Sequence, residues 1–180
     1  MMRTPASNKF INALSHLEKD GVLDKSILIN AASLRILGVR VYTYFIDLLV
    51  QKSYYFTKAT EMKFSPEYEL EPVRLRIADF PLRLGTISGD LCSFRHLIEP
   101  YNIYEEVEFK LDAQIKLIKI RPHDYLRKDC EVAIESMIQR FEERYWQDLY
   151  SYHKQLEAID LGMSKDAMQF GPQKFLKFEG

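Results

Sequence analysis

Apolar side chains recur at helical spacing near the start of the chain, between a capping residue and a glycine. Ser7 is a favourable N-cap, and Gly21 suits the left-handed position that follows a helix. The pattern therefore predicts a helix from Ser7 to about Lys19. Its apolar face consists of Phe10, Ile11, Leu14 and Leu17.

The next stretch, from Asp24 or Ser26 to Gln51, is apolar except for a few regularly spaced polar positions. Those positions recur at steps of three, four or seven residues, which predicts one long helix that is buried on most sides. The alternative is a helix followed by a strand, because residues 39–46 are rich in β-branched and aromatic side chains and Gly38 offers a break. The pattern favours the continuous helix over 27–50 but leaves both open. The polar positions are Asn30, Ser33, Arg40, Asp47 and Gln51.

The middle third of the chain is typical of a sheet. Residues 53–63 contain aromatic and β-favouring side chains, and residues 73–77 alternate apolar and basic positions like a strand with one wet face. Prolines at positions 66, 72 and 81 argue against a long helix here. A short helix is expected over 87–99, between Gly85 and Pro100.

Two further alternating segments, 107–111 and 115–117, lie on either side of Asp112, Ala113 and Gln114. Short alternating runs separated by a few turn-forming residues predict an antiparallel hairpin. A single bulged strand is the alternative.

The last third carries the longest periodic signal. Pro122 and Asp124 suit the first turn of a helix, and no glycine or proline follows until Gly162, which would end it. Roughly forty helical residues would span about 55 Å, which exceeds a domain diameter of about 40 Å for this length. Part of the apolar stripe would then be covered by another chain, by the tail, or by the helix itself after a kink. The stripe consists of Leu126, Cys130, Ala133, Met137, Phe141, Tyr145, Leu149, Tyr152, Leu156 and Ile159.

Together these elements predict an α+β fold. A small, mostly antiparallel sheet from the middle third would pack against N-terminal helices and one long C-terminal helix. Residues 1–162 would form a single domain, and the apolar tail 163–180 would dock on that domain or on a partner. The length of 180 residues fits this organisation.

The composition of the chain excludes several classes of protein. The formal net charge is -1, with 47% hydrophobic residues, which excludes a disordered chain and a globally basic nucleic-acid binder. Two cysteines, Cys92 and Cys130, predict reduced thiols in a cytoplasmic protein. The apolar stretch 27–50 is interrupted by Arg35, Arg40 and Asp47, so no membrane span is expected.

No combination of residues forms a convincing catalytic or metal-binding motif. Cys92 and His96 are spaced to share a helix face, but two ligands do not make a metal site. Residues 85–90 could hold an anion or assist a cysteine-dependent enzyme, although Ser88 or Asp90 as an N-cap explains them equally well. The sequence therefore leans toward a non-enzymatic protein and leaves a small cysteine-dependent enzyme as the less favoured alternative. We expect no cofactor and no metal.

Arginines and aromatic side chains in the predicted sheet suggest nucleic-acid binding as an alternative function. A sheet face that carries both can stack on bases and contact phosphates. Ion pairs with nearby glutamates would remove this support. The candidate residues are Tyr54, Phe56, Arg74, Arg76 and Arg83.

The long helix and the tail favour a different function, that of a non-enzymatic interaction or assembly protein. Trp146 and Tyr150 are spaced to share a side of the helix that is offset from the apolar stripe. Tyrosine and tryptophan are enriched among the residues that dominate binding energy at protein interfaces. We expect a homodimer or a subunit of a larger complex. The partner-binding candidates are Tyr145, Trp146, Leu149, Tyr150, Tyr152, Leu156, Phe170 and Phe175.

Overall fold

The computed structural model describes residues 5–61, 72–88, 94, 97–140, 146–166 and 176–177. The first half of the chain forms α1 (Pro5–Lys19), η1 (Leu23–Lys25), β1 (Ser26–Ile29), α2 (Asn30–Ile36), β2 (Ile46–Val50) and α3 (Lys52–Glu61). The second half forms β3 (Val73–Ile77), β4 (Phe80–Thr86), β5 (Ile103–Leu111), β6 (Gln114–Ile120), α4 (His123–Arg140), α5 (Trp146–Asp166) and β7 (Leu176–Lys177).

The predicted α+β class is confirmed, but the sheet is neither small nor mostly antiparallel. Its strand order is β3-β4-β2-β1-β6-β5-β7. The pairs β2/β4 and β1/β6 are parallel, whereas β1/β2, β3/β4, β5/β6 and β5/β7 are antiparallel. The sheet is therefore mixed, and its two central strands come from the N-terminal third rather than from the middle third.

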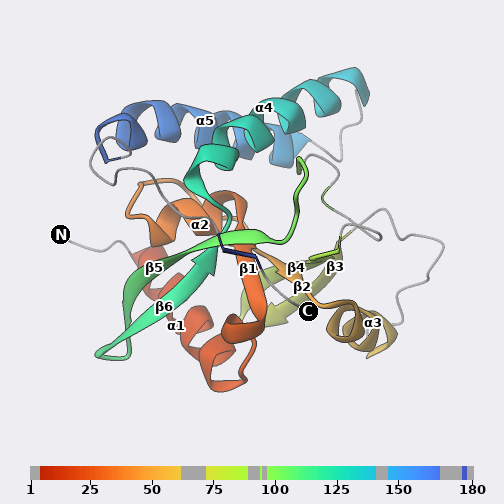
Figure 1. Ribbon diagram of the computed structural model, residues 1–180, viewed down its shortest axis with the longest axis vertical. Coiled ribbons are helices and arrows are strands. Elements are labelled where there is room, and N and C mark those ends of the chain that lie inside the picture. Colours follow the sequence, from red (N-terminus) through yellow and green to blue (C-terminus); the bar gives the residue numbers. More distant parts are fainter. Residues whose placement is uncertain are drawn as a thin grey trace.

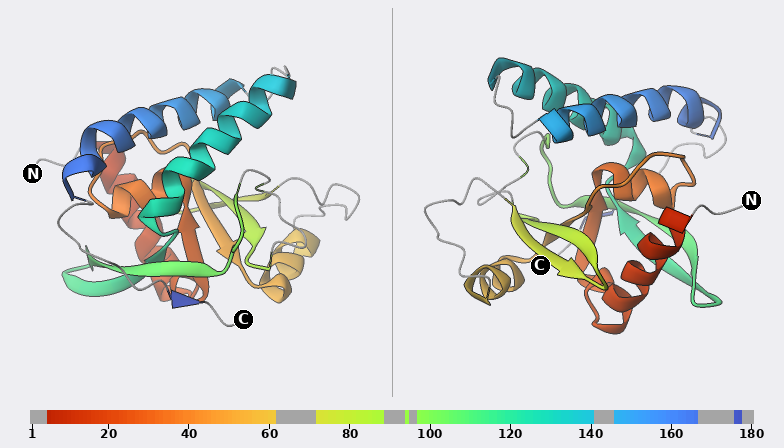
Figure 2. Two further views of the ribbon diagram at one scale, coloured as in Figure 1. Left: turned by 45° about the horizontal axis from the view of Figure 1, so that its top comes forward. Right: turned by 180° about the vertical axis from the view of Figure 1, so that it is seen from behind.

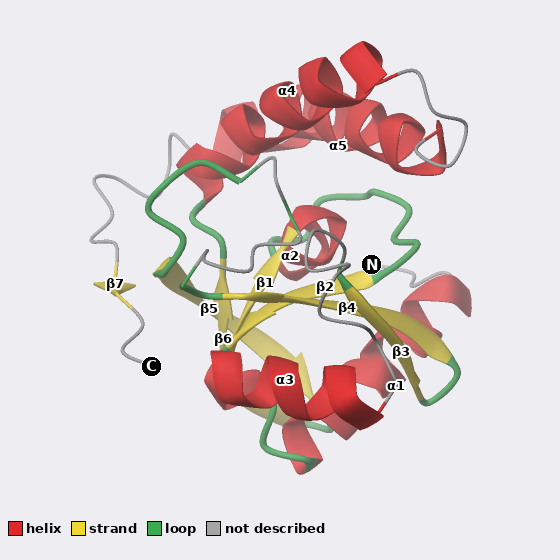
Figure 3. Ribbon diagram, turned by 90° about the vertical axis from the view of Figure 1, so that its right-hand side faces the viewer, coloured by secondary structure: helices red, strands yellow, loops and turns green. Residues whose placement is uncertain are grey.

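Helices cover both faces of the sheet (Figure 1). Helices α4 and α5 lie side by side in an outer layer, and α2 lies between that layer and the sheet (Figure 3). Helices α1 and α3 cover the opposite face, as the views in Figures 2 and 3 agree. The main core lies under α1, where Phe10, Leu14 and Leu17 pack against Leu48 and Leu84 of the central strands.

The continuous helix predicted over 27–50 is wrong. The segment instead forms β1, the short helix α2, a loop and β2, which is closer to the alternative of a helix followed by a strand. All residues of β1 and β2 are buried, because both strands are covered on both faces. A strand that is buried on both faces is a continuous run of apolar residues in the sequence. It therefore lacks the alternation of apolar and polar residues by which a strand with one exposed face is recognised.

The sheet predicted over 53–63 is also wrong, since residues 52–61 form the helix α3. Tyr55 and Ala59, four residues apart, are the buried residues of this helix. Their packing on the core outweighs the β-preference of the aromatic side chains, because β-propensity depends strongly on tertiary context. The short helix predicted over 87–99 falls largely outside the described residues.

Three local predictions are confirmed. The first helix ends at Lys19 as expected, although it begins earlier, at Pro5. Residues 73–77 form β3. Strands β5 and β6 form an antiparallel hairpin around Asp112 and Ala113, which both have positive φ angles. Positive φ at both central residues matches the right-handed twist of the flanking strands.

The single long C-terminal helix is wrong as well. Arg127 of α4 forms an ion pair with Asp160 of α5, and Cys130 of α4 donates to Oε1 of Gln155 at 3.6 Å. Residues this far apart in sequence cannot meet within one straight helix, so α4 and α5 are two helices packed against each other. Gly162, the expected end, lies inside α5. The buried residues of the apolar stripe that the structure describes pack between the two helices and against Leu34 and Val39.

Helix α4 is fixed to the sheet by Arg121, which directly follows β6 and has no exposed surface. Its Nε donates to Oδ2 of Asp129 on α4 at 2.9 Å, and its guanidinium also donates to the backbone carbonyls of Ile98 and Pro100. A buried guanidinium needs such partners for its donors. These bonds join α4, the end of β6 and the segment before β5.

Leu176 and Lys177 extend the sheet at its β5 edge, where they pair with Tyr104 and Ile103. Residues 163–166 of the predicted tail belong to α5. The remainder of the tail, including Phe170 and Phe175, lies outside the described residues. None of the helices in the described part of the chain combines the length and the apolar character that crossing a membrane requires.

Candidate functional site

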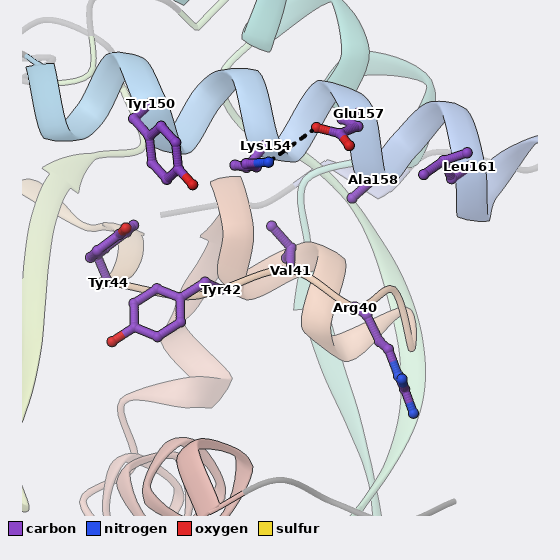
Figure 4. A pocket seen from close by; sticks show the side chains of 9 residues that line it. All are labelled: Arg40, Val41, Tyr42, Tyr44, Tyr150, Lys154, Glu157, Ala158 and Leu161. Carbon is purple, nitrogen blue, oxygen red and sulfur yellow. Dashed lines mark hydrogen bonds and ion pairs between the residues drawn. The ribbon is translucent and has the colours of Figure 1, made fainter.

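The candidate site is an open groove of about 430 Å³ between α5 and the loop that joins α2 to β2 (Figure 4). Tyr150 points from α5 across the groove toward Tyr42 and Tyr44, whereas Arg40 points away from the helix. The groove is lined by Arg40, Val41, Tyr42, Tyr44, Tyr150, Lys154, Glu157, Ala158 and Leu161.

The loop reaches this position because α2 ends abruptly. Gly38 has a φ of 85°, a left-handed conformation that glycine adopts without steric cost. Backbone bonds from Gly38 to Arg35 and from Val39 to Leu34 close the helix end. Val39 then packs in a cluster with Leu34 and Tyr152, and the following residues run beside α5.

Large apolar side chains are concentrated on this side of the molecule. The exposed fractions are 63% for Tyr42, 62% for Trp146, 54% for Tyr150 and 77% for Leu161. We call these four residues the α5 face. The rings of Tyr42 and Tyr44 pack edge to face with centroids 4.5 Å apart, so the loop side is a pre-formed aromatic surface.

Two of the charged residues at the groove, Lys154 and Glu157, compensate each other. Nζ of Lys154 lies 5.6 Å from the ring centroid of Tyr150 and forms an ion pair of 3.4 Å with Glu157. Both side chains of the pair are about half exposed or more, so solvent screens the interaction and it is easily exchanged. The groove thus combines an aromatic centre with an adjustable polar rim.

A buried polar cluster holds α5 in place above the sheet. Arg83 of β4 donates from Nε to Oδ1 of Asp47 at 2.7 Å and from Nη1 to Oδ1 of Asp148 at 3.0 Å. Asn30 donates to the other oxygen of Asp47 at 2.8 Å. Phe45 stacks on the guanidinium, with 4.1 Å between the arginine Cζ and the ring centroid. The cluster therefore joins β2, β4, α2 and α5.

Electrostatics keep the guanidinium of Arg83 charged. Burial alone lowers the pKa of Arg83, but the carboxylates of Asp47 and Asp148 outweigh it, so the pKa lies above its ordinary value. Tyr152 of α5 is fully buried beside the cluster. Burial raises the pKa of Tyr152 well above its ordinary value, with Arg83 opposing the shift. Its phenol therefore stays neutral and serves as part of the packing under α5.

The predicted partner-binding residues divide into three groups. Trp146 and Tyr150 are exposed on the α5 face. Leu149 and Leu156 are half-buried, and Tyr152 is buried, so these three support α5 rather than form its outer surface. Tyr145, Phe170 and Phe175 lie outside the described residues.

The predicted nucleic-acid residues are not brought together. Arg83 is buried and paired with two aspartates. Arg74 lies opposite Arg83 in the β3/β4 register, and Arg76 is two residues further along the same face of β3. Tyr54 packs with the core on the face covered by α1 and α3, the other side of the sheet. Phe56 is exposed on α3, so the predicted arginines do not share one surface with the predicted aromatic residues Tyr54 and Phe56.

The candidates for cysteine or metal chemistry gain no supporting geometry. Cys130 is buried, and burial raises the pKa of its thiol to about 12, which disfavours the reactive thiolate. Cys92 and His96 lie outside the described residues, as do Gly89 and Asp90 of the predicted anion loop. Within the described ranges, no group of three histidine, cysteine, aspartate or glutamate side chains is placed to hold a metal ion.

The sequence did not indicate Tyr42, Asp148 or Leu161. Tyr42 was hidden because its segment read as a continuation of a buried helix. Leu161 follows Trp146 and Tyr150 by fifteen and eleven residues, so a helical projection places it on their side of α5. Asp148 carried no local signal, since its partner Arg83 is 65 positions away.

Comparison with protein-family models, with curated proteins and with solved structures finds no match for this chain. Its function must therefore be argued from the geometry of the site.

Proposed function

We propose that this chain is a non-enzymatic interaction subunit that binds a protein partner through the α5 face. The observation that carries the proposal is that Tyr42, Tyr150 and Leu161, each more than half exposed, line one groove. Trp146, which is also more than half exposed, lies one helical turn before Tyr150 on α5. Exposed apolar surface of this kind costs solubility, and a contiguous patch rimmed by polar groups is typical of interaction sites. Aromatic residues at its centre are the usual binding anchors.

The contacts that hold α5 and the neighbouring loop in position support the same function. Asp148 and Tyr152 anchor α5 from below through the Arg83 cluster, and Val39 anchors the loop. Side chains held on rigid elements lose less conformational entropy when they bind, so a pre-organised surface gains affinity. Arg40, Lys154 and Glu157 supply a polar rim that can adapt to a partner.

The test is site-specific photo-cross-linking of the full chain in its native cells. A benzophenone amino acid replaces Tyr150 in one variant and Phe56 in the other. Both residues are exposed aromatics on helices, but Phe56 lies on α3, away from the α5 face. We expect a discrete protein adduct from position 150 and none of that mass from position 56. Equal adducts from both positions, or no adduct from position 150, would contradict the proposal.

A further inference from the structure

We infer that the partner of the α5 face is a second copy of this chain, with the two α5 helices antiparallel about a two-fold axis between His153 and Lys154. This inference rests on the proposed function of that face. It names the partner and fixes the register, and both can be tested separately from partner binding as such.

The residues on the outward side of α5 have the same spacing when the helix is followed in either direction, so an antiparallel copy of α5 can face them in register. Trp146, Tyr150, Glu157 and Leu161 follow one another at steps of four, seven and four residues, which keeps them on one side of the helix. This spacing is the same in both directions. In the antiparallel arrangement Trp146 lies opposite Leu161 of the second copy, and Tyr150 lies opposite Glu157 of the second copy.

Charge decides between the two orientations of the helix pair. Parallel pairing would place the exposed Glu157 directly beside Glu157 of the second copy. Like charges in direct opposition disfavour a pairing and so select against it. Antiparallel pairing separates the two Glu157 side chains and places each about one helical turn from Lys154 of the second copy. The two Lys154 side chains then lie close to the two-fold axis, between the Glu157 carboxylates of the two copies. Because the Lys154–Glu157 pair within one chain is already solvent-screened, it can exchange for the pair between copies at little cost.

The two-fold symmetry also limits the assembly to a closed dimer. In a two-fold interface each contact occurs twice, and the same patch is used by both copies. Here both apolar ends, Trp146 and Leu161, are covered at once. The aromatic side of the groove, with Tyr42 and Tyr44, then flanks the helix pair on each side.

The exposed apolar residues of the β5/β6 hairpin lack this self-complementarity. Ile115 and Leu117 lie on β6 opposite Lys110 and Glu108 of β5, so charged neighbours interrupt them on the hairpin surface. Charges on such a strand surface discourage association between copies. The outward side of α5 therefore fits a copy of itself better than the hairpin surface does.

The first experiment is sedimentation equilibrium of the untagged full chain over a wide concentration range. We expect a concentration-dependent species of twice the chain mass of 21.2 kDa. Leu161→Glu should weaken self-association at least tenfold, because the new carboxylate would face the ring of Trp146 of the second copy. Leu117→Glu is the matched control, since Leu117 is also an exposed leucine, and it should leave self-association unchanged. Near-ultraviolet circular dichroism checks that both variants are folded.

The second experiment tests the register by cysteine cross-linking in a Cys92→Ser, Cys130→Ala background. A mixture of Trp146→Cys and Leu161→Cys chains should form a disulfide between copies on mild oxidation. Trp146→Cys alone should not, because the antiparallel register holds its two copies about 22 Å apart along the helix axis. A chain that stays monomeric at every concentration, a dimer insensitive to Leu161→Glu, or efficient cross-linking of Trp146→Cys to itself would each overturn the inference.

These outcomes are distinct from failure of the proposed function. A monomer whose position 150 still cross-links to a different protein would overturn the second-copy inference and leave the interaction face in place. A monomer without any adduct at position 150 would overturn both.

Discussion

Asp148 of α5 accepts two hydrogen bonds from Nη1 of Arg83, at 3.0 and 3.1 Å, across 65 positions of the chain. Arg83 also binds both oxygens of Asp47, so one guanidinium joins the sheet to the helix that carries the candidate site. Trp146 and Tyr150 lie on either side of Asp148 in α5. The position of the aromatic face therefore depends on a contact that is almost entirely buried.

Replacing Arg83 should destabilise the protein strongly. Arg83→Met would leave the carboxylate of Asp47 buried without its main partner, and breaking such a pair costs about 3–5 kcal/mol. The measurement is the free energy of unfolding from urea titration. Arg76→Met is the control, because Arg76 is exposed on β3 and its loss should cost about 0.5 kcal/mol or less. Equal losses for the two variants would show that the buried cluster is not a main support of the fold.

Asp148→Asn should have a smaller effect, because the Asp148 side chain keeps 19% exposure and Arg83 retains Asp47. We expect a loss of about 1–2 kcal/mol, typical of a hydrogen bond to a charged group. The same variant should loosen the N-terminal end of α5, which amide hydrogen exchange at residues 150–153, the first with carbonyl acceptors inside the helix, would detect. Unchanged exchange there would mean that α5 is held mainly by its apolar contacts.

The buried thiol of Cys130 should make stability fall at alkaline pH. Its pKa is raised from the ordinary 9.0 to about 12, so the folded chain keeps a proton that the unfolded chain loses. The contribution of this group is therefore constant below about pH 9 and is lost as the pH rises toward 12, at up to about 1.4 kcal/mol per pH unit. Urea titrations at pH 8, 9 and 10 measure it, and Cys130→Ala should show the shallower decline. Parallel declines would indicate that the thiol is not protected in the folded chain.

Gly85→Ala should destabilise the sheet although alanine is larger by only one carbon. A Cβ at this position would lie 2.6 Å from Cδ2 of Phe94, which is too close for carbon atoms. Overpacking of this kind costs about 1–3 kcal/mol. Phe94→Ala should reduce the penalty in a double-mutant cycle, because the conflicting ring is then absent. If Gly85→Ala costs as much stability in the Phe94→Ala background, contact with the Phe94 ring is not the cause of the loss.

Ala113→Gly should stabilise the β5/β6 hairpin. Ala113 has a φ of 65°, a left-handed conformation that costs an alanine roughly 1 kcal/mol and glycine much less. The greater entropy of glycine in the unfolded chain offsets part of this, so we expect a net gain of about 0.5 kcal/mol. Thermal unfolding measures the change. The control is the same substitution inside a helix, where the expected sign is reversed: Ala158→Gly within α5 should lower stability by about 1 kcal/mol.

The local elements that the sequence predicts correctly each have one solvent-facing side. In the first helix and in residues 73–77 the buried and exposed positions alternate with the period of the element. The hairpin likewise has a short turn at the expected position. For such elements the contrast between apolar and polar positions records the backbone geometry directly.

The candidate site could be predicted only in part. Trp146 and Tyr150 are recognisable because their spacing sets them apart from the apolar stripe of the same helix. Tyr152, which lies on that stripe, proves to be buried under the helix. Tyr42 could not be paired with Tyr150, because nothing local indicates that the loop after α2 runs beside α5.

The sequence by itself determined the α+β class, the first helix, the strand at 73–77 and the hairpin, because each is specified by neighbours in the chain. Only the tertiary structure decided the central strands β1 and β2, the pairing of α4 with α5 and the burial of Arg83. Burial on both faces removes the periodic signal of a central strand, and the apolar stripe of a helix does not say which element covers it. From the sequence alone Arg83 is expected to be exposed, because its partners Asp47 and Asp148 are brought to it only by the fold.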